Sequence, residues 1–146
     1  MTSGRHLSMR SVLVLCGVGA LAVGASTPAL AQSLQVPLVR QDFSDCANGN
    51  VTDPGGLLTS GTLSLVRNGN GTTSISVAMT VNPDTTYHFF LKCVTLLGDI
   101  KTDDEGIGEA AFTFPTNSVG GVYGFDMYPE GAPAGNKFQS VQVRFQ

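Results

Sequence analysis

Apolar and polar residues alternate with a period of two over much of the chain after residue 60. In the stretch SGTLSLVRNGNGTTSISVAMTV, residues 60–81, apolar side chains take every second position on both sides of Asn68-Gly69-Asn70-Gly71. This period indicates β-strands, because successive side chains of a strand point to opposite sides. Asn-Gly sequences readily take the positive φ angles of tight turns, so the stretch predicts a β-hairpin.

The same alternation predicts strands in the rest of the chain. The run TTYHFFLKCVTLL, residues 85–97, places Tyr87, Phe89, Leu91 and Cys93 on one side of a strand, which we expect to face the core. No segment has the 3.6-residue period of an amphipathic helix. About seven short strands separated by turns are typical of an antiparallel sandwich or a small barrel. Beyond the hairpin and this run, strands are predicted at residues 36–43, 96–102, 108–114, 121–128 and 138–145.

The first 31 residues have the pattern of a cleaved signal peptide. Arg5 and Arg10 give a positive charge to the segment before an uncharged apolar run, residues 11–25. Ala29 and Ala31 are small residues at the positions that a signal peptidase reads. The run is shorter than the stretch of about 20 apolar residues that a transmembrane helix needs. We therefore expect cleavage after residue 31, a single domain over residues 32–146, and a secreted or periplasmic protein without stable membrane insertion.

Cleavage would remove Cys16 and leave Cys46 and Cys93 as an even pair. In an oxidising compartment we expect these two residues to form a disulfide. A thiol redox pair or a zinc site is disfavoured, because CxxC spacing is absent and His88 is the only histidine after residue 31.

The expected mature chain is weakly acidic. It has six basic and eleven acidic residues, which give a net charge of −5. Nucleic acids and anionic membranes bind clustered Lys and Arg side chains, so we expect no nucleic acid as a partner.

The stretch GDIKTDDEGIGEAAF, residues 98–112, holds five carboxylates between residues 99 and 109. Asp103, Asp104 and Glu105 are weak candidates for a calcium site, but no register of the stretch has the carboxylate and glycine spacing of an EF-hand loop. A catalytic carboxylate pair needs two side chains set across a cleft, which neighbours at the tip of a turn do not provide. Asp and Gly both favour tight turns, so we interpret the stretch as a turn between two strands without a bound metal.

The run TTYHFFLKCVTLLGDIKTDDEGIGEAAFTF, residues 85–114, resembles the pattern of small bacterial secreted Ig-like domains. In those domains a Thr-Thr-Tyr start leads through an apolar strand to a Thr-Asp turn with spaced glycines, and then to a Phe-rich strand. The resemblance implies an all-β fold, a single antiparallel Ig-like β-sandwich of about seven strands, and no particular activity. The chain has no Trp, so it lacks the Trp that antibody domains pack against their disulfide.

No set of residues in the sequence indicates catalysis. His88 lies on an alternating strand, and a histidine base needs a nucleophile and an orienting acid near it. Neither a GxSxG nucleophile elbow nor a phosphate-binding glycine loop is present. We therefore expect a binding or structural domain that is not an enzyme and uses no cofactor, with an unknown protein or polysaccharide as its partner.

Other functional classes fit parts of the sequence. A carbohydrate-binding module needs exposed aromatic side chains, for which Phe90, Tyr128 and Tyr87 are the candidates, and a calcium-assisted surface module would use the acidic stretch. An outer-membrane β-barrel fits the alternation and the position of Phe145 near the end of the chain. Such barrels, however, have strands of about 10 residues with an outward apolar band, whereas the outward residues here are mostly polar.

The connection from Tyr128 to Lys137 is a shaped loop, because two Pro stiffen it and two Gly let it bend. Strand parity places Asp126 and Tyr128 outward. The alternative is that the loop folds over the end of the domain and that Tyr128 seals the core. The outward arrangement predicts a partner-binding surface formed by Asp126, Tyr128, Glu130, Asn136 and Lys137.

Overall fold

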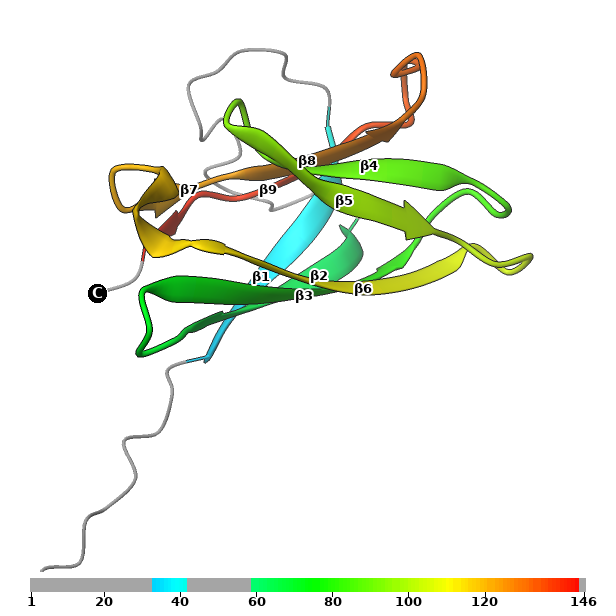
Figure 1. Cartoon of the computed structure of the whole chain (residues 1–146). Coiled ribbons are helices and arrows are strands. Elements are labelled where there is room, and N and C mark those ends of the chain that lie inside the picture. Colours follow the sequence, from blue (N-terminus) through cyan, green and yellow to red (C-terminus); the bar gives the residue numbers. More distant parts are fainter. Residues whose placement is uncertain (1–32, 42–58, 145–146) are drawn as a thin grey trace, which may run out of the picture.

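The computed structural model describes residues 33–41 and 59–144, and in these residues the protein is all-β (Figure 1). No helix of the described part is long and apolar enough to cross a membrane. The predicted signal peptide, residues 1–31, lies outside the described residues. The elements are β1 (Ser33–Arg40), β2 (Thr59–Arg67), β3 (Thr72–Thr80), β4 (Thr86–Leu91), β5 (Thr95–Lys101), β6 (Ile107–Pro115), the short 3-10 helix η1 (Thr116–Ser118), β7 (Val122–Tyr123), β8 (Phe125–Pro129), β9 (Phe138–Ser140) and β10 (Val143–Arg144).

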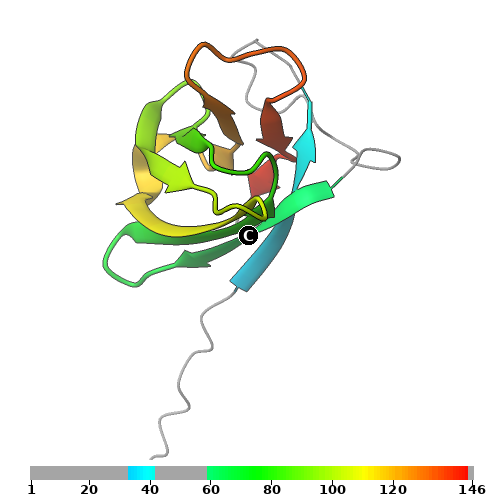
Figure 2. The ribbon, with the colours of Figure 1, turned by 90° about the vertical axis from the view of Figure 1, so that its right-hand side faces the viewer.

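Eight of these strands form one antiparallel sheet in the order β5-β4-β8-β9-β1-β2-β3-β6, and β7 pairs with β10. The sheet curls around a central core until its two edge strands, β5 and β6, come together at the turn that joins them (Figures 1 and 2). The sheet is therefore nearly closed, like a barrel.

The predicted Ig-like sandwich of about seven strands has two separate sheets that face each other, and the single curled sheet of eight strands is not clearly divided in this way. Here β1 pairs with β2 along one side and with β9 along the other, so it joins both halves into one sheet. The structure also has more strands, because the predicted strand at 121–128 divides at Gly124 into β7 and β8, and the strand predicted at 138–145 divides into β9 and β10.

The predicted hairpin is formed by β2 and β3. Leu63 lies opposite Val77 and Leu65 lies opposite Ile75, with all four side chains buried. The backbone N–H of Asn68 donates to the carbonyl oxygen of Thr72 at 2.8 Å and closes the turn. The alternation thus correctly predicts both the hairpin and the side of each strand that faces the core.

The interior is filled by large aromatic side chains. The Phe89 ring stacks between the Phe112 ring, at a centroid distance of 5.4 Å, and the Phe125 ring, at 5.8 Å. Phe114 meets Phe125 edge-on at 6.0 Å. Because these residues come from alternate positions of β4, β6 and β8, the core confirms the inward side predicted for those strands.

Cys93 does not share the inward side of β4, contrary to the sequence prediction. The strand ends at Leu91, and the next residues form a turn in which the N–H of Val94 donates to the carbonyl oxygen of Leu91 at 2.9 Å. Cys93 is exposed in this turn with a φ of 59°, because the chain reverses there and the alternation stops. Cys46 lies outside the described residues, so the Cys46–Cys93 disulfide stays a prediction.

Candidate functional site

The outward side of β5, β4 and β8 carries a histidine, two carboxylates and two aromatic side chains close together. In the register of these strands, His88 lies between Asp99 of β5 and Tyr128 of β8. In the next outward row, Phe90 lies between Leu96 and Asp126. We call this surface the outer aromatic face, and define it by His88, Phe90, Leu96, Asp99, Asp126, Tyr128 and the adjoining Glu130.

A bulge in β5 sets the apolar part of the outer aromatic face. The pairing shifts between Phe89 and Phe90, so that Phe89 lies opposite Gly98 and Phe90 lies opposite Leu96. The extra residue, Leu97, packs partly buried against the core. Leu96 is left outward with 49% of its surface exposed, beside the aromatic residue of the neighbouring strand.

Phe90 and Tyr128 form a stacked pair on this face. Their ring centroids are 4.9 Å apart with an interplanar angle of 20°, and both side chains are half-buried. Burial, followed by the charge of Asp126, raises the pKa of Tyr128, so its hydroxyl keeps the proton that makes it a hydrogen-bond donor. Met127, the neighbour of Tyr128, fills the core instead. Tyr128 is thus outward, and the alternative in which it seals the core is wrong.

His88 is held between two carboxylates. Its Nδ1 lies 2.7 Å from Oδ1 of Asp99, and its Nε2 lies 3.3 Å from Oε2 of Glu130. The exposed fractions of the three side chains are 28% for His88, 55% for Asp99 and 97% for Glu130. The hydrogen bond with Asp99, and next that with Glu130, raises the pKa of His88 above its ordinary value of 6.5.

Asp126 has the most perturbed carboxyl group of the outer aromatic face. Burial raises its pKa from 3.8 to about 6, and the nearby charge of Lys92 opposes this shift. One carboxyl oxygen, Oδ1, is buried and has no hydrogen-bond partner. The carboxylate form is therefore poorly solvated in the folded protein.

We expect Asp126→Asn to stabilise the protein at pH 7.5 and to have little effect near pH 3.5. Because the pKa of Asp126 is higher in the folded than in the unfolded chain, folding favours the protonated acid, and stability falls as the pH rises from 3.8 to about 6. A shift of this size corresponds to about 3 kcal/mol, which solvent screening of a partly exposed group reduces to roughly 1–2 kcal/mol. Urea unfolding of both proteins at the two pH values measures the difference. An equal difference at both pH values would contradict the assigned titration.

The other residues of the predicted partner-binding surface have separate environments. Asn136 accepts a hydrogen bond of 2.6 Å from the hydroxyl of Tyr87, whose ring is fully buried. Asn136 therefore supports the core, and Tyr87 is not an exposed aromatic residue as the carbohydrate-binding hypothesis required. Lys137 is half-buried, and its charge acts on Tyr128 by lowering that residue's pKa. The structure thus places Asp126, Tyr128 and Glu130 on or beside the outer aromatic face, whereas the side chain of Asn136 is bonded to Tyr87.

The acidic stretch forms the turn between β5 and β6, as predicted. Oδ1 of Asp103 accepts hydrogen bonds from the backbone N–H groups of Glu105, at 3.0 Å, and Ile107, at 2.7 Å. Asp103 thus stabilises its own turn, while Asp104 and Glu105 are exposed. Across residues 33–41 and 59–144, no group of three or more His, Cys, Asp or Glu side chains is arranged to hold a metal ion.

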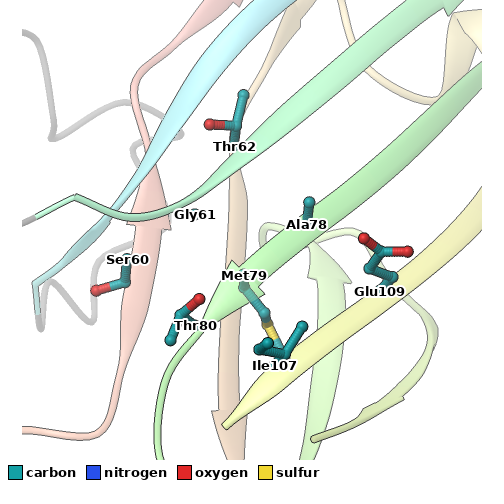
Figure 3. A pocket seen from close by; sticks show the side chains of 8 residues that line it. All are labelled: Ser60, Gly61, Thr62, Ala78, Met79, Thr80, Ile107 and Glu109. Carbon is teal, nitrogen blue, oxygen red and sulfur yellow. The ribbon is translucent and has the colours of Figure 1, made fainter. Parts of the chain in front are cut away.

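A shallow hollow lies on β2, β3 and β6, at the other end of the strand order (Figure 3). Its floor is low because Gly61 and Ala78 carry no large side chain, and a Cβ on Gly61 would lie 2.6 Å from the carbonyl oxygen of Ala78. A second hollow, with a volume of about 490 Å³, adjoins the one in Figure 3, and both are lined by Thr62, Ala78 and Glu109. Most of the lining is small or hydroxyl-bearing, so these hollows offer a ligand fewer distinctive groups than the outer aromatic face. The first hollow has a volume of about 390 Å³ and is lined by Ser60, Gly61, Thr62, Ala78, Met79, Thr80, Ile107 and Glu109.

No protein-family model matches the chain, and no curated protein matches it. The resemblance to secreted Ig-like domains therefore stays a prediction.

Sequence reasoning missed the cluster around His88. It placed His88 and Phe90 correctly on one side of β4, but it did not bring Asp99 or Glu130 to the imidazole. The signal that could have found Asp99 is the short turn at residues 92–94, which pairs β4 with β5 as a hairpin and places Asp99 opposite His88.

Proposed function

We propose that the protein is an exported, non-catalytic binding domain whose recognition surface is the outer aromatic face. The observation that carries this proposal is the stacked Phe90–Tyr128 pair, which stands outward beside the exposed Leu96. Aromatic side chains are enriched in protein interfaces and dominate their binding energy, while charged groups form the rim. His88, Asp99 and Glu130 supply such a charged border on this face.

Further features support a role in binding. Both ring nitrogens of His88 face carboxylates, which favours a structural or recognition role over that of a general base with a free nitrogen. The signal-peptide pattern of residues 1–31 supports export. The resemblance to secreted Ig-like domains also supports binding, and it would make the curled sheet an Ig-like sandwich whose halves are joined through β1.

A carbohydrate-binding module is the second candidate, because two of its three proposed aromatic residues meet on one face. Phe90 and Tyr128 provide ring surface, and Asp99, His88 and the Tyr128 hydroxyl provide donors and acceptors that suit sugar hydroxyl groups. A polysaccharide would then contact the same residues as a protein partner.

The test of the proposed function is retention of partners by the exported protein and by its Phe90→Ala variant. The immobilised protein is exposed to envelope and medium fractions of its own source, and separately to insoluble polysaccharides. Loss of an interface anchor costs about 2 kcal/mol or more, so we expect retention to fall by roughly 30-fold in the variant. Retention on purified polysaccharide alone would select the second candidate.

The matched control is Thr62→Ala on β2, which lies in the hollow of Figure 3 and outside the outer aromatic face. This variant should retain the partner as the unchanged protein does, and melting curves show whether each variant is folded. Equal retention by folded Phe90→Ala and by the unchanged protein would refute the proposed recognition surface.

A further inference from the structure

His88 connects three separate parts of the sheet. It lies on β4, its Nδ1 meets Asp99 of β5 at 2.7 Å, and its Nε2 meets Glu130, the first residue after β8, at 3.3 Å. Glu130 begins the loop between β8 and β9, where the N–H of Ala132 donates to the carbonyl oxygen of Pro129 at 2.9 Å. The imidazole therefore links the start of this loop to the outer aromatic face.

Both contacts require the charged form of the imidazole. A neutral imidazole has one N–H donor and one acceptor nitrogen, whereas ionised carboxylates only accept hydrogen bonds. Only the imidazolium can donate to Asp99 and Glu130 together, so loss of its proton must break one contact. The contact with Glu130 is the longer one, and its carboxylate is 97% exposed and readily hydrated, so this contact breaks first.

Several charged or titratable groups lie near His88, and any that titrates in the same pH range would obscure the titration of its imidazole. Asp99 lies opposite His88 on β5, and Lys101 lies two residues further along that strand, opposite Thr86. Tyr128 and Glu130 lie on the other side of His88. Asp126 lies in the next row, opposite Phe90, and its pKa of about 6 overlaps the range in which histidine titrates. An experiment on His88 therefore needs Asp126 replaced by Asn.

We propose that protonated His88 latches the start of the β8–β9 loop, through Glu130, onto β4 and β5, and that release of the latch changes the outer aromatic face beside Tyr128. The effect on recognition rests on the proposed function, but the latch itself does not. The opposite end of the loop is held independently by the hydrogen bond between Tyr87 and Asn136. Release should consequently affect the first residues of the loop more than the last.

The test is an NMR titration of the full chain carrying Asp126→Asn, between pH 4.5 and pH 8.5. It follows the imidazole of His88, identified by its absence in His88→Gln, and the backbone amide of Gly131. We expect the His88 pKa to lie above 6.5 and the Gly131 amide to shift with the same midpoint. Glu130→Gln should lower the His88 pKa and abolish the Gly131 shift at that midpoint. Asp99→Asn should lower the His88 pKa further, because the bond with Asp99 is the larger cause.

Glu105→Gln is the matched control, because Glu105 is an exposed carboxylate in the β5–β6 turn. It should leave both titrations unchanged. A Gly131 amide that ignores the His88 midpoint, or that follows it equally in Glu130→Gln, would overturn the latch. Since no partner is present, this failure is distinct from failure of the proposed function, which shows as partner retention that does not depend on Phe90.

Discussion

We expect Phe89→Ala to lower the free energy of unfolding by about 3–5 kcal/mol, the usual cost of removing a buried aromatic ring. The Phe89 side chain is fully buried and lies between the rings of Phe112 and Phe125, at centroid distances of 5.4 and 5.8 Å. These partners belong to β6 and β8, which lie in different halves of the sheet order. The truncation therefore leaves a cavity at the point where the two halves of the curled sheet contact each other.

Phe90→Ala is the matched control for this prediction, because the same residue type occupies the next position of β4 but points outward. Phe90 is half-buried and contacts Tyr128 on the outer aromatic face, so we expect its truncation to cost about 1–2 kcal/mol. Urea unfolding measures both variants. If Phe89→Ala costs no more than Phe90→Ala, the inward and outward sides of β4 have been assigned wrongly.

The sides of individual strands could be predicted from the sequence because alternation is a local property. Tyr87, Phe89 and Leu91 are buried and His88 and Phe90 are outward, as a period of two requires. The prediction failed at Cys93, two residues after the strand ends. The alternation continues in the letters of the sequence there, but the backbone has already turned.

The arrangement of the strands could not be predicted in the same way. Closure of the sheet depends on β1 pairing with both β2 and β9, and the residues of β9 lie about a hundred positions from those of β1. Such pairings are decided by how the whole core packs, and no local pattern encodes them. Strand number and turn spacing left both a sandwich and a small barrel open, and only the resemblance of residues 85–114 to Ig-like domains favoured the sandwich.

In the candidate site, too, the local features could be predicted from the sequence and the long-range contacts could not. The outward direction of Tyr128 follows from the parity of its own strand, and the prediction is correct. The carboxylates of Asp99 and Glu130, which lie 11 and 42 residues from His88, reach it only through the pairing of β4 with β5 and β8. Those pairings also create the Phe90–Tyr128 contact, so the composition of the face depends on the register of three strands.

The acidic turn between β5 and β6 gives the second large prediction, because its geometry depends on glycine at position 106. Gly106 has a φ of 83°, and a Cβ built on it would lie 2.2 Å from the carbonyl oxygen of Val81. This oxygen cannot easily move away, since the N–H of Val81 donates to the carbonyl oxygen of Gly106 at 2.9 Å and holds the two segments together. The turn is thus docked against the end of β3.

We expect Gly106→Ala to lower the free energy of unfolding by roughly 3 kcal/mol or more, from a positive φ and a steric clash together. Gly71→Ala separates the two causes, because Gly71 has a φ of 81° but nothing lies within 4 Å of its Cβ position. That control should cost only about 1–2 kcal/mol, the penalty of the left-handed conformation alone. Urea unfolding followed by circular dichroism measures both. Equal costs at the two glycines would show that the turn can move away from Val81, and that its contact with β3 does not constrain the edge of the sheet.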